Sequence, residues 1–186
     1  MIVIKRMVIA LFIGVMACAS VSAGVDYKSM LKQVTPMDEV IARGGKIVYV
    51  DMVGDLFHAG HVKFLERARA LGDYLIVGLN SDEDCAGYKR LPILTLEERV
   101  AAALGCRYVD AVLPAAPLIQ GADLLDQLSV GAVAHADDFT PEKIEKYYGD
   151  AVRRGIFHLL PYTQGISSSD IIKRIVTRDA EALRAK

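Results

Sequence analysis

The sequence predicts an α/β fold, namely a five-stranded parallel sheet with helices on both faces. Short apolar runs rich in β-branched residues recur along the chain, and such runs are typical of strands that are buried on both faces. Segments with apolar residues at helical spacing separate these runs, and this alternation favours parallel strands joined by right-handed crossovers. Capping residues, glycines and prolines mark where the segments begin and end.

The elements follow in order from these signals. A helix is expected over 26–43, with an interruption near Thr35-Pro36 and an end at Gly44-Gly45. Buried strands are expected at five runs, which are 46–50, 74–79, 108–113, 132–135 and 156–160. Helices are expected between and after them, over about 58–71, 81–87, 95–105, 122–128, 140–154 and 167–186. Thr95 and Glu98 have the spacing of a capping box, and Pro141 suits a first helical position.

The composition is that of a globular protein without a nucleic-acid partner. Of 186 residues, 53% are hydrophobic and 24% are charged, which is enough for a full core and argues against disorder. The formal net charge is −1 and aromatic residues make up 7%, so the chain has neither a basic field nor an aromatic platform for nucleic acid. The three cysteines form no C-x-x-C pair, which excludes a disulfide framework and a zinc knuckle.

The first 24 residues differ from the rest of the chain. Lys5 and Arg6 precede the uncharged apolar run 7–19, and the small residues Val21-Ser-Ala23 follow. This order is typical of a secretory signal peptide, although membrane association through residues 7–23 and a translation start at Met30 or Met37 are alternatives. We therefore divide the chain into a signal-peptide-like or anchor leader (1–24), an N-terminal helical extension (25–45) and a main domain (46–186).

Two histidines at the start of a helix are the first candidate site. His58 and His61 follow an apolar strand and a loop that contains Gly54, and Gly60 lies between them. Imidazoles three residues apart on a first helical turn point the same way, and the N–H groups of a helix start suit phosphate. No third His or Cys lies nearby, so a metal site is not predicted. Core packing is the structural alternative, but the loop and the helix start favour a phosphate site.

A second helix start, at 162–170, carries a run of hydroxyl groups. These hydroxyls either cap the helix or hold phosphate oxygens. Both helix starts follow strands, so they open at the same edge of the sheet, where ligands bind in such folds. Lys89-Arg90 and Asp137-Asp138 also follow strands at that edge. No Walker lysine motif and no G-x-G-x-x-G occurs, which argues against P-loop and dinucleotide-binding proteins.

These motifs, taken together, resemble those of the cytidylyltransferases in the HxGH nucleotidyltransferase superfamily, especially the ethanolamine-phosphate branch. The similarity runs from about Lys46 to Val176. The matching motifs are His58-Ala-Gly-His61, the second-strand segment 70–78, Glu97-Glu-Arg99, Arg107-Tyr-Val-Asp110, Leu113-Pro-Ala-Ala-Pro117, His135-Ala-Asp-Asp138 and Thr163-Gln-Gly-Ile-Ser-Ser-Ser169.

Three positions depart from the family pattern. The family usually has Gly-x-Phe-Asp before the histidines, whereas this chain has Met52-Val-Gly-Asp55, so the glycine is shifted by two places. Tyr162 stands where the last motif usually opens with Arg. The lost guanidinium should weaken nucleotide binding or transfer its role to Lys89, Arg90 or Arg154. Ala136 replaces a glycine, which is a milder change.

The resemblance implies a Rossmann-like HxGH nucleotidyltransferase fold and a direct transfer reaction. A phosphomonoester oxygen would attack the α-phosphorus of CTP, and pyrophosphate would leave with Mg²⁺. The implied catalytic residues are His58, His61 and Lys89. The implied nucleotide-binding residues are Val53, Gly54, Gly60, Asp137, Tyr162, Thr163, Gly165, Ile166, Ser167, Ser168 and Ser169. No metal ligand on the protein is implied.

Phosphoethanolamine is the expected acceptor, and the product would be a CDP-alcohol for phospholipid synthesis. The alternatives are ATP or another donor on the same fold, and a nucleotide-binding protein without catalysis. A homodimer is expected because relatives commonly pair beside the histidine motif. Since CTP is an internal metabolite, a cytoplasmic catalytic domain is favoured, with or without a membrane tether, and the leader makes export the alternative.

Overall fold

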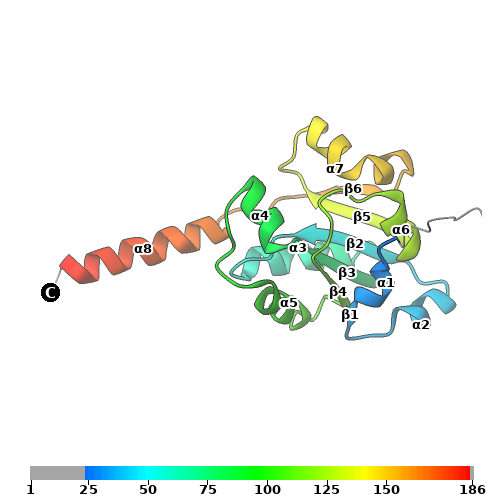
Figure 1. Cartoon of the computed structure of the whole chain (residues 1–186), viewed down its shortest axis with the longest axis horizontal. Coiled ribbons are helices and arrows are strands. Elements are labelled where there is room, and N and C mark those ends of the chain that lie inside the picture. Colours follow the sequence, from blue (N-terminus) through cyan, green and yellow to red (C-terminus); the bar gives the residue numbers. More distant parts are fainter. Residues whose placement is uncertain (1–23, 185–186) are drawn as a thin grey trace, which may run out of the picture.

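Residues 24–184 are described by a computed structural model, and a six-stranded sheet lies at the centre (Figure 1). The strands are β1 (Lys32–Gln33), β2 (Ile47–Met52), β3 (Tyr74–Leu79), β4 (Ala111–Pro114), β5 (Val130–Ala136) and β6 (Phe157–Leu160). Their order across the sheet is β1-β4-β3-β2-β5-β6. All neighbours pair in parallel except β1 and β4, so the predicted parallel α/β sheet is confirmed.

Helices cover both faces of the sheet because the side chains of its central strands alternate between two apolar cores. From β2, Ile47 and Tyr49 enter one core, whereas Val48 and Val50 enter the other. The first core is covered by α1 (Tyr27–Met30), α2 (Met37–Ala42), α6 (Ala122–Gln127) and α7 (Pro141–Arg153). The second is covered by α3 (Ala59–Arg69) and α5 (Leu96–Leu104). The predicted capping box of α5 is present, with Thr95 and Glu98 bonded reciprocally.

Strand β1 is the main difference from the predicted fold. The expected helix over 26–43 is divided into α1, β1 and α2, and β1 pairs antiparallel with β4 through Lys32↔Val112 and Gln33↔Ala111. Pro36 has an extended backbone and forms the N-cap of α2, as expected for a residue that cannot donate a helical hydrogen bond. The extension therefore covers the otherwise open edge of β4 and brings the sheet from five strands to six.

The ends of β2 and β5 define the place where a ligand would bind. From β2 the chain passes to β3 on one side, while β5 lies on the other. A crevice forms outside the carboxyl ends of two such strands. Near this edge lie α4 (Asp82–Tyr88) and the start of α8 (Ser168–Arg184), and α8 then extends away from the sheet (Figure 1).

Among residues 24–184, no helix has both the length and the apolar character required to cross a bilayer. The predicted leader lies outside the described residues apart from Gly24.

Candidate active site

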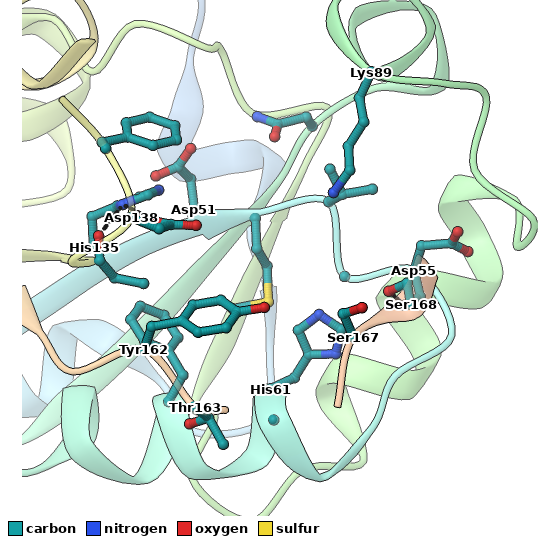
Figure 2. Close-up of a pocket in the computed structure, with 18 of the residues that line it drawn as sticks. Asp51, Asp55, His61, Lys89, His135, Asp138, Tyr162, Thr163, Ser167 and Ser168 are labelled. Atoms are coloured by element: carbon teal, nitrogen blue, oxygen red, sulfur yellow. Dashed lines mark hydrogen bonds and ion pairs between the residues drawn. The ribbon is translucent and has the colours of Figure 1, made fainter. Parts of the chain in front are cut away.

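A cavity of about 610 Å³ opens at the carboxyl ends of β2 and β5. One end is lined by imidazole, ammonium and hydroxyl groups from His58, His61, Lys89, Ser167 and Ser168. The other end is lined by carboxylates and aromatic rings from Asp51, His135, Asp138, Phe139 and Tyr148. Figure 2 shows the side chain of Lys89 reaching down toward His61, with Tyr162 lying between the two ends.

The two histidines form the start of α3 and present the same ring nitrogen to the cavity. His58 is the N-cap, and its Nδ1 accepts a hydrogen bond from the Gly60 N–H at 3.1 Å. The His58 N–H donates in turn to Nδ1 of His61 at 3.2 Å, and the rings stack at 3.9 Å between centroids. Since both Nδ1 atoms accept, each neutral ring carries its proton on Nε2. Both histidines therefore have a free donor for a ligand oxygen.

Gly60 is required by the close approach of these rings. A Cβ at this position would lie 2.9 Å from the Nδ1 and Cε1 atoms of His58 and 3.3 Å from Cγ2 of Ile166. Ile166 belongs to the loop before α8, so the glycine lets this loop pack against the histidine turn. The glycine of the H-x-G-H motif thus lets the two predicted helix starts pack against each other.

Burial keeps both imidazoles neutral. Burial lowers the pKa of His58. Burial and then the neighbouring His58 lower the pKa of His61 to about 4, although Asp55 opposes this shift. The rings consequently act as neutral hydrogen-bond donors near pH 7, and the positive charge at this end of the cavity comes from Lys89.

Acid should destabilise the fold through His61. Because its folded pKa of about 4 lies below the unfolded value of about 6.5, only the unfolded chain takes up this proton between those pH values. The stabilising contribution is therefore complete above pH of about 6.5 and is lost as the pH falls toward about 4, by up to about 3 kcal/mol. Urea unfolding of the wild type and of His61→Asn across this range measures the difference. The same pH dependence in both proteins would contradict the expectation.

Asp55 fixes the loop that precedes the histidines. Its carboxylate accepts hydrogen bonds from the N–H groups of Ile93 and Leu94 and pairs with Arg90 at 2.9 Å. Burial opposes ionisation, but the Leu94 and Ile93 amides and the Arg90 guanidinium hold the pKa of this carboxyl below its ordinary value. The backbone carbonyl of Asp55 accepts a hydrogen bond from the Ser168 hydroxyl at 2.7 Å. Asp55 therefore connects the histidine loop with both the Lys89 segment and α8.

The shifted glycine of the Met52-to-Asp55 loop has a conformational role. Gly54 has φ of +70°, and a Cβ there would lie 2.8 Å from Leu79. A left-handed backbone of this kind favours glycine. Met52, at the usual glycine position, instead continues β2 by pairing with Leu79, which explains why the strand extends beyond the predicted end at Val50.

The loop before α8 is held by contacts from neighbouring elements. The Tyr162 N–H donates to the Asp137 carboxylate at 2.7 Å. Arg67 of α3 donates to the Pro161 carbonyl at 2.6 Å and to the Thr163 hydroxyl at 3.4 Å. Ser167 accepts from the Asp170 N–H at 3.1 Å, so one of the predicted hydroxyls does cap the helix.

At the carboxylate end of the cavity, the pair Asp137-Asp138 was a candidate from the sequence, but Asp51 was not predicted. Asp51 accepts a hydrogen bond from the Tyr148 hydroxyl at 2.7 Å. Burial raises the pKa of the Asp51 carboxyl, while His135 and the Tyr148 hydroxyl oppose this rise. His135 lies against Phe139 and Tyr148, with ring centroids 4.1 and 5.2 Å apart. A carboxylate that is surrounded by aromatic rings suits a small organic cation.

Most of the predicted site residues meet in this cavity. Its lining includes Val53, Gly54, His58, Gly60, His61, Lys89, Tyr162, Thr163, Ile166, Ser167 and Ser168. Asp137, Gly165 and Ser169 do not line it, and the neighbouring Asp138 does. Of the predicted substitutes for the missing arginine, Arg90 lines the cavity but pairs with Asp55, whereas Arg154 pairs with Asp126 at 2.6 Å on the surface.

The chain is similar in sequence to known cytidylyltransferases. The sequence model of the family described as Cytidylyltransferase-like matches residues 54–174. The chain is 42% identical over 136 residues to an ethanolamine-phosphate cytidylyltransferase of Dictyostelium discoideum, covering 70% of this chain and 38% of that protein. It is 41% identical over 138 residues to the Arabidopsis thaliana protein of that name, covering 70% and 32%. Choline-phosphate cytidylyltransferase A of Homo sapiens is 39% identical over 132 residues, covering 69% and 36%.

The chain thus spans about a third of the length of these relatives, with shares of 32% to 38%. A crystal structure of the lipopolysaccharide core biosynthesis protein from Thermoplasma volcanium GSS1 superposes with a TM-score of 0.53 at 20% identity. It covers 66% of this chain and 100% of that one, and it supports the α/β fold alone. This chain belongs to the cytidylyltransferase-like family.

Proposed function

We propose that the chain transfers CMP from CTP to phosphoethanolamine and releases pyrophosphate and CDP-ethanolamine. The observation that carries this proposal is the polarity of one cavity, with phosphate-type donors at one end and the Asp51 carboxylate among aromatic rings at the other. The first end suits a triphosphate, and the second suits the ammonium group of a small phosphomonoester. The names of the relatives agree with CTP as the donor and with a cationic acceptor.

In the proposed reaction an acceptor phosphate oxygen attacks the α-phosphorus of CTP. The bond from this phosphorus to the β-phosphate oxygen breaks, and pyrophosphate leaves with the electron pair. His58 and His61 donate through Nε2–H to triphosphate oxygens, and Lys89 offsets the charge that grows on the leaving group. Because a phosphate dianion is already a nucleophile, the residues mainly orient the two substrates and stabilise charge.

Mg²⁺ is proposed to enter with CTP. No group of three or more His, Cys, Asp or Glu side chains is arranged to hold a metal within residues 24–184. We propose that nucleotide phosphates and water supply most ligands of this ion. The bound ion would neutralise phosphate charge, while Asp51 and Asp138 lie at the acceptor end of the cavity.

A pyrophosphate-release screen tests the function. CTP and ATP are each combined with phosphoethanolamine, phosphocholine, glycerol-3-phosphate and aminoethylphosphonate in the presence of Mg²⁺. We expect the highest kcat/KM for CTP with phosphoethanolamine. A preference for ATP would favour an adenylyltransferase, and nucleotide binding without turnover on any acceptor would favour a non-catalytic protein.

Tyr162 should set the affinity for the nucleotide. The ring lines the cavity at the position where the motif that this chain resembles usually opens with arginine, so one cationic partner for phosphate is replaced by a neutral phenol. Tyr162→Arg is expected to lower the KM for CTP about tenfold, the effect of one charge-assisted hydrogen bond. Tyr162→Phe is the control and should change KM less than about twofold. An unchanged KM in Tyr162→Arg would show that other cations already hold the phosphates.

The proposal includes a cytoplasmic site of action and a homodimer. CTP is made inside cells, so an exported enzyme would lack its donor. N-terminal sequencing of the native protein tests whether the leader is retained, and sedimentation analysis of the purified chain tests the dimer. Removal of the leader together with export would overturn the proposed location.

A further inference from the structure

Arg99 is fully buried outside the cavity, and its contacts suggest a function beyond packing. We propose that Arg99 is a positioning residue that holds the start of the 82–94 segment and thereby places Lys89 over the phosphate end of the cavity. This inference rests on the proposed function for the role of Lys89.

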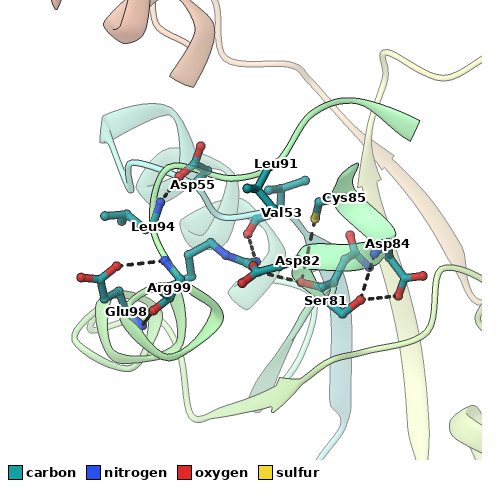
Figure 3. Close-up of polar contacts among 12 residues, drawn as sticks. Val53, Asp55, Ser81, Asp82, Asp84, Cys85, Leu91, Leu94, Glu98 and Arg99 are labelled. Atoms are coloured by element: carbon teal, nitrogen blue, oxygen red, sulfur yellow. Dashed lines mark hydrogen bonds and ion pairs between the residues drawn. The ribbon is translucent and has the colours of Figure 1, made fainter. Parts of the chain in front are cut away.

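Every described contact of the Arg99 guanidinium lies at the carboxyl edge of the sheet. The side chain has 0% exposure. It donates to the carbonyl of Val53 at 2.6 Å, just after β2, and to the carbonyl of Asn80 at 2.9 Å, just after β3. It also pairs with Asp82 at 2.5 Å, in the first turn of α4 (Figure 3). A guanidinium is costly to bury unless its donors are used. Both terminal nitrogens of Arg99 bind these three groups, whereas its Nε is buried without a partner among the described residues.

The other end of the segment is held by Asp55. Its carboxylate receives the N–H groups of Ile93 and Leu94 as well as Arg90. Two internal charged residues of opposite sign therefore fix the segment from both ends, one through Asp82 and the other through Leu94 (Figure 3). Both act on the loop after β2 that leads to the histidines, because Arg99 of α5 binds the Val53 carbonyl and Asp55 belongs to this loop.

Lys89 lies between these two fixed ends, directly after the last residue of α4. It is the C-cap of α4, and its N–H donates to the Cys85 carbonyl at 3.0 Å. Cys85 is buried, whereas Tyr88 is 49% exposed. This seven-residue helix is held at its first turn by Asp82, in its middle by the buried Cys85, and at its last residue by the Tyr88 hydroxyl, which donates to the Asn80 side chain at 3.4 Å. A small rotation there would move the ammonium group of Lys89 relative to His61.

Combining a substitution of Arg99 or Asp82 with Lys89→Ala distinguishes a positioning role from a role in general stability. A merely structural arginine would change the amount of folded enzyme but would act independently of Lys89. A positioning residue must lose its kinetic effect when Lys89 is removed, because the two substitutions then act on the same interaction.

The experiment uses the mildest break in the network, Asp82→Asn, which keeps the size of the side chain and removes its charge. Glu83→Gln is the matched control, because Glu83 lies in the same turn of α4 and has no ion pair among the described residues. Arg99→Lys is the second variant, since a lysine keeps the charge but cannot form the fork. We measure kcat and KM with CTP and phosphoethanolamine, each also in the Lys89→Ala background, and amide hydrogen exchange of residues 82–94 without ligand.

We expect Asp82→Asn and Arg99→Lys to lower kcat/KM about tenfold or more, as displaced catalytic groups commonly do. In the Lys89→Ala background the further loss should be less than about twofold. Exchange in α4 should rise in both variants and not in Glu83→Gln. Equal losses with and without Lys89, or unchanged exchange in α4, would overturn the inference while the proposed function stands. No wild-type turnover with any substrate pair would overturn the function and this role of Lys89 together.

Discussion

His61→Asn should lower kcat about 10²- to 10³-fold, the loss that follows removal of one donor to a transition-state oxygen. The asparagine side chain can still accept the hydrogen bond that the His58 N–H gives to Nδ1 of His61. It has no group at the position of Nε2, so only the donor that faces the cavity is lost. The KM for CTP should change less than kcat if the imidazole acts mainly in the transition state.

Two further variants make this test specific to the ring nitrogen. His61→Gln places an amide near the position of Nε2, so it should retain more activity than His61→Asn. His158→Asn changes a histidine in β6 that does not line the cavity, and its kcat should match the wild type. Circular dichroism and urea unfolding at pH of about 7.5 confirm that each variant is folded, above the range where His61 titrates. Turnover of His61→Asn within about threefold of the wild type would exclude a transition-state role.

Local signals in the sequence were sufficient for most of the fold. Strand β3 begins and ends at the predicted residues, Tyr74 and Leu79, because its apolar run is bounded by residues that favour turns and caps. The helix over 96–104 was predicted from a capping box that the structure contains. Strand β1 was missed because it is only two residues long and its pairing with β4 is a tertiary contact. Such a short strand has no periodicity to detect.

The site residues that were predicted lie in compact motifs or directly after strands. His58, Gly60 and His61 share one helical turn, so their common direction follows from the spacing. Asp51 was overlooked because it lies inside an apolar strand, and its partner Tyr148 is 97 positions away. For a related reason, Asp137 was predicted to face the ligand, whereas its neighbour Asp138 lines the cavity. Asp137 continues the β5 ladder by donating its N–H to Leu160 and binds Tyr162, which leaves Asp138 to line the cavity.

At the carboxylate end of the cavity, Asp51 should control the KM for phosphoethanolamine. Asp51→Asn should raise the KM for phosphoethanolamine about 10²-fold, because the charge that would pair with the ammonium group is removed from a half-buried site. The KM for CTP should stay within about twofold, since the triphosphate is expected at the opposite end of the cavity. Initial rates at saturating concentrations of the other substrate separate the two KM values.

Neutral and altered acceptors distinguish charge pairing from a change of shape. Glycerol-3-phosphate has no ammonium group, so its kcat/KM should be nearly equal in the wild type and in Asp51→Asn. Tyr148→Phe keeps the ring and removes the hydroxyl that donates to Asp51 at 2.7 Å, and it should have an intermediate effect on phosphoethanolamine alone. If Asp51→Asn lowered kcat/KM equally for both acceptors, the carboxylate would serve the fold or the nucleotide. The cationic acceptor would then lose its support from this structure.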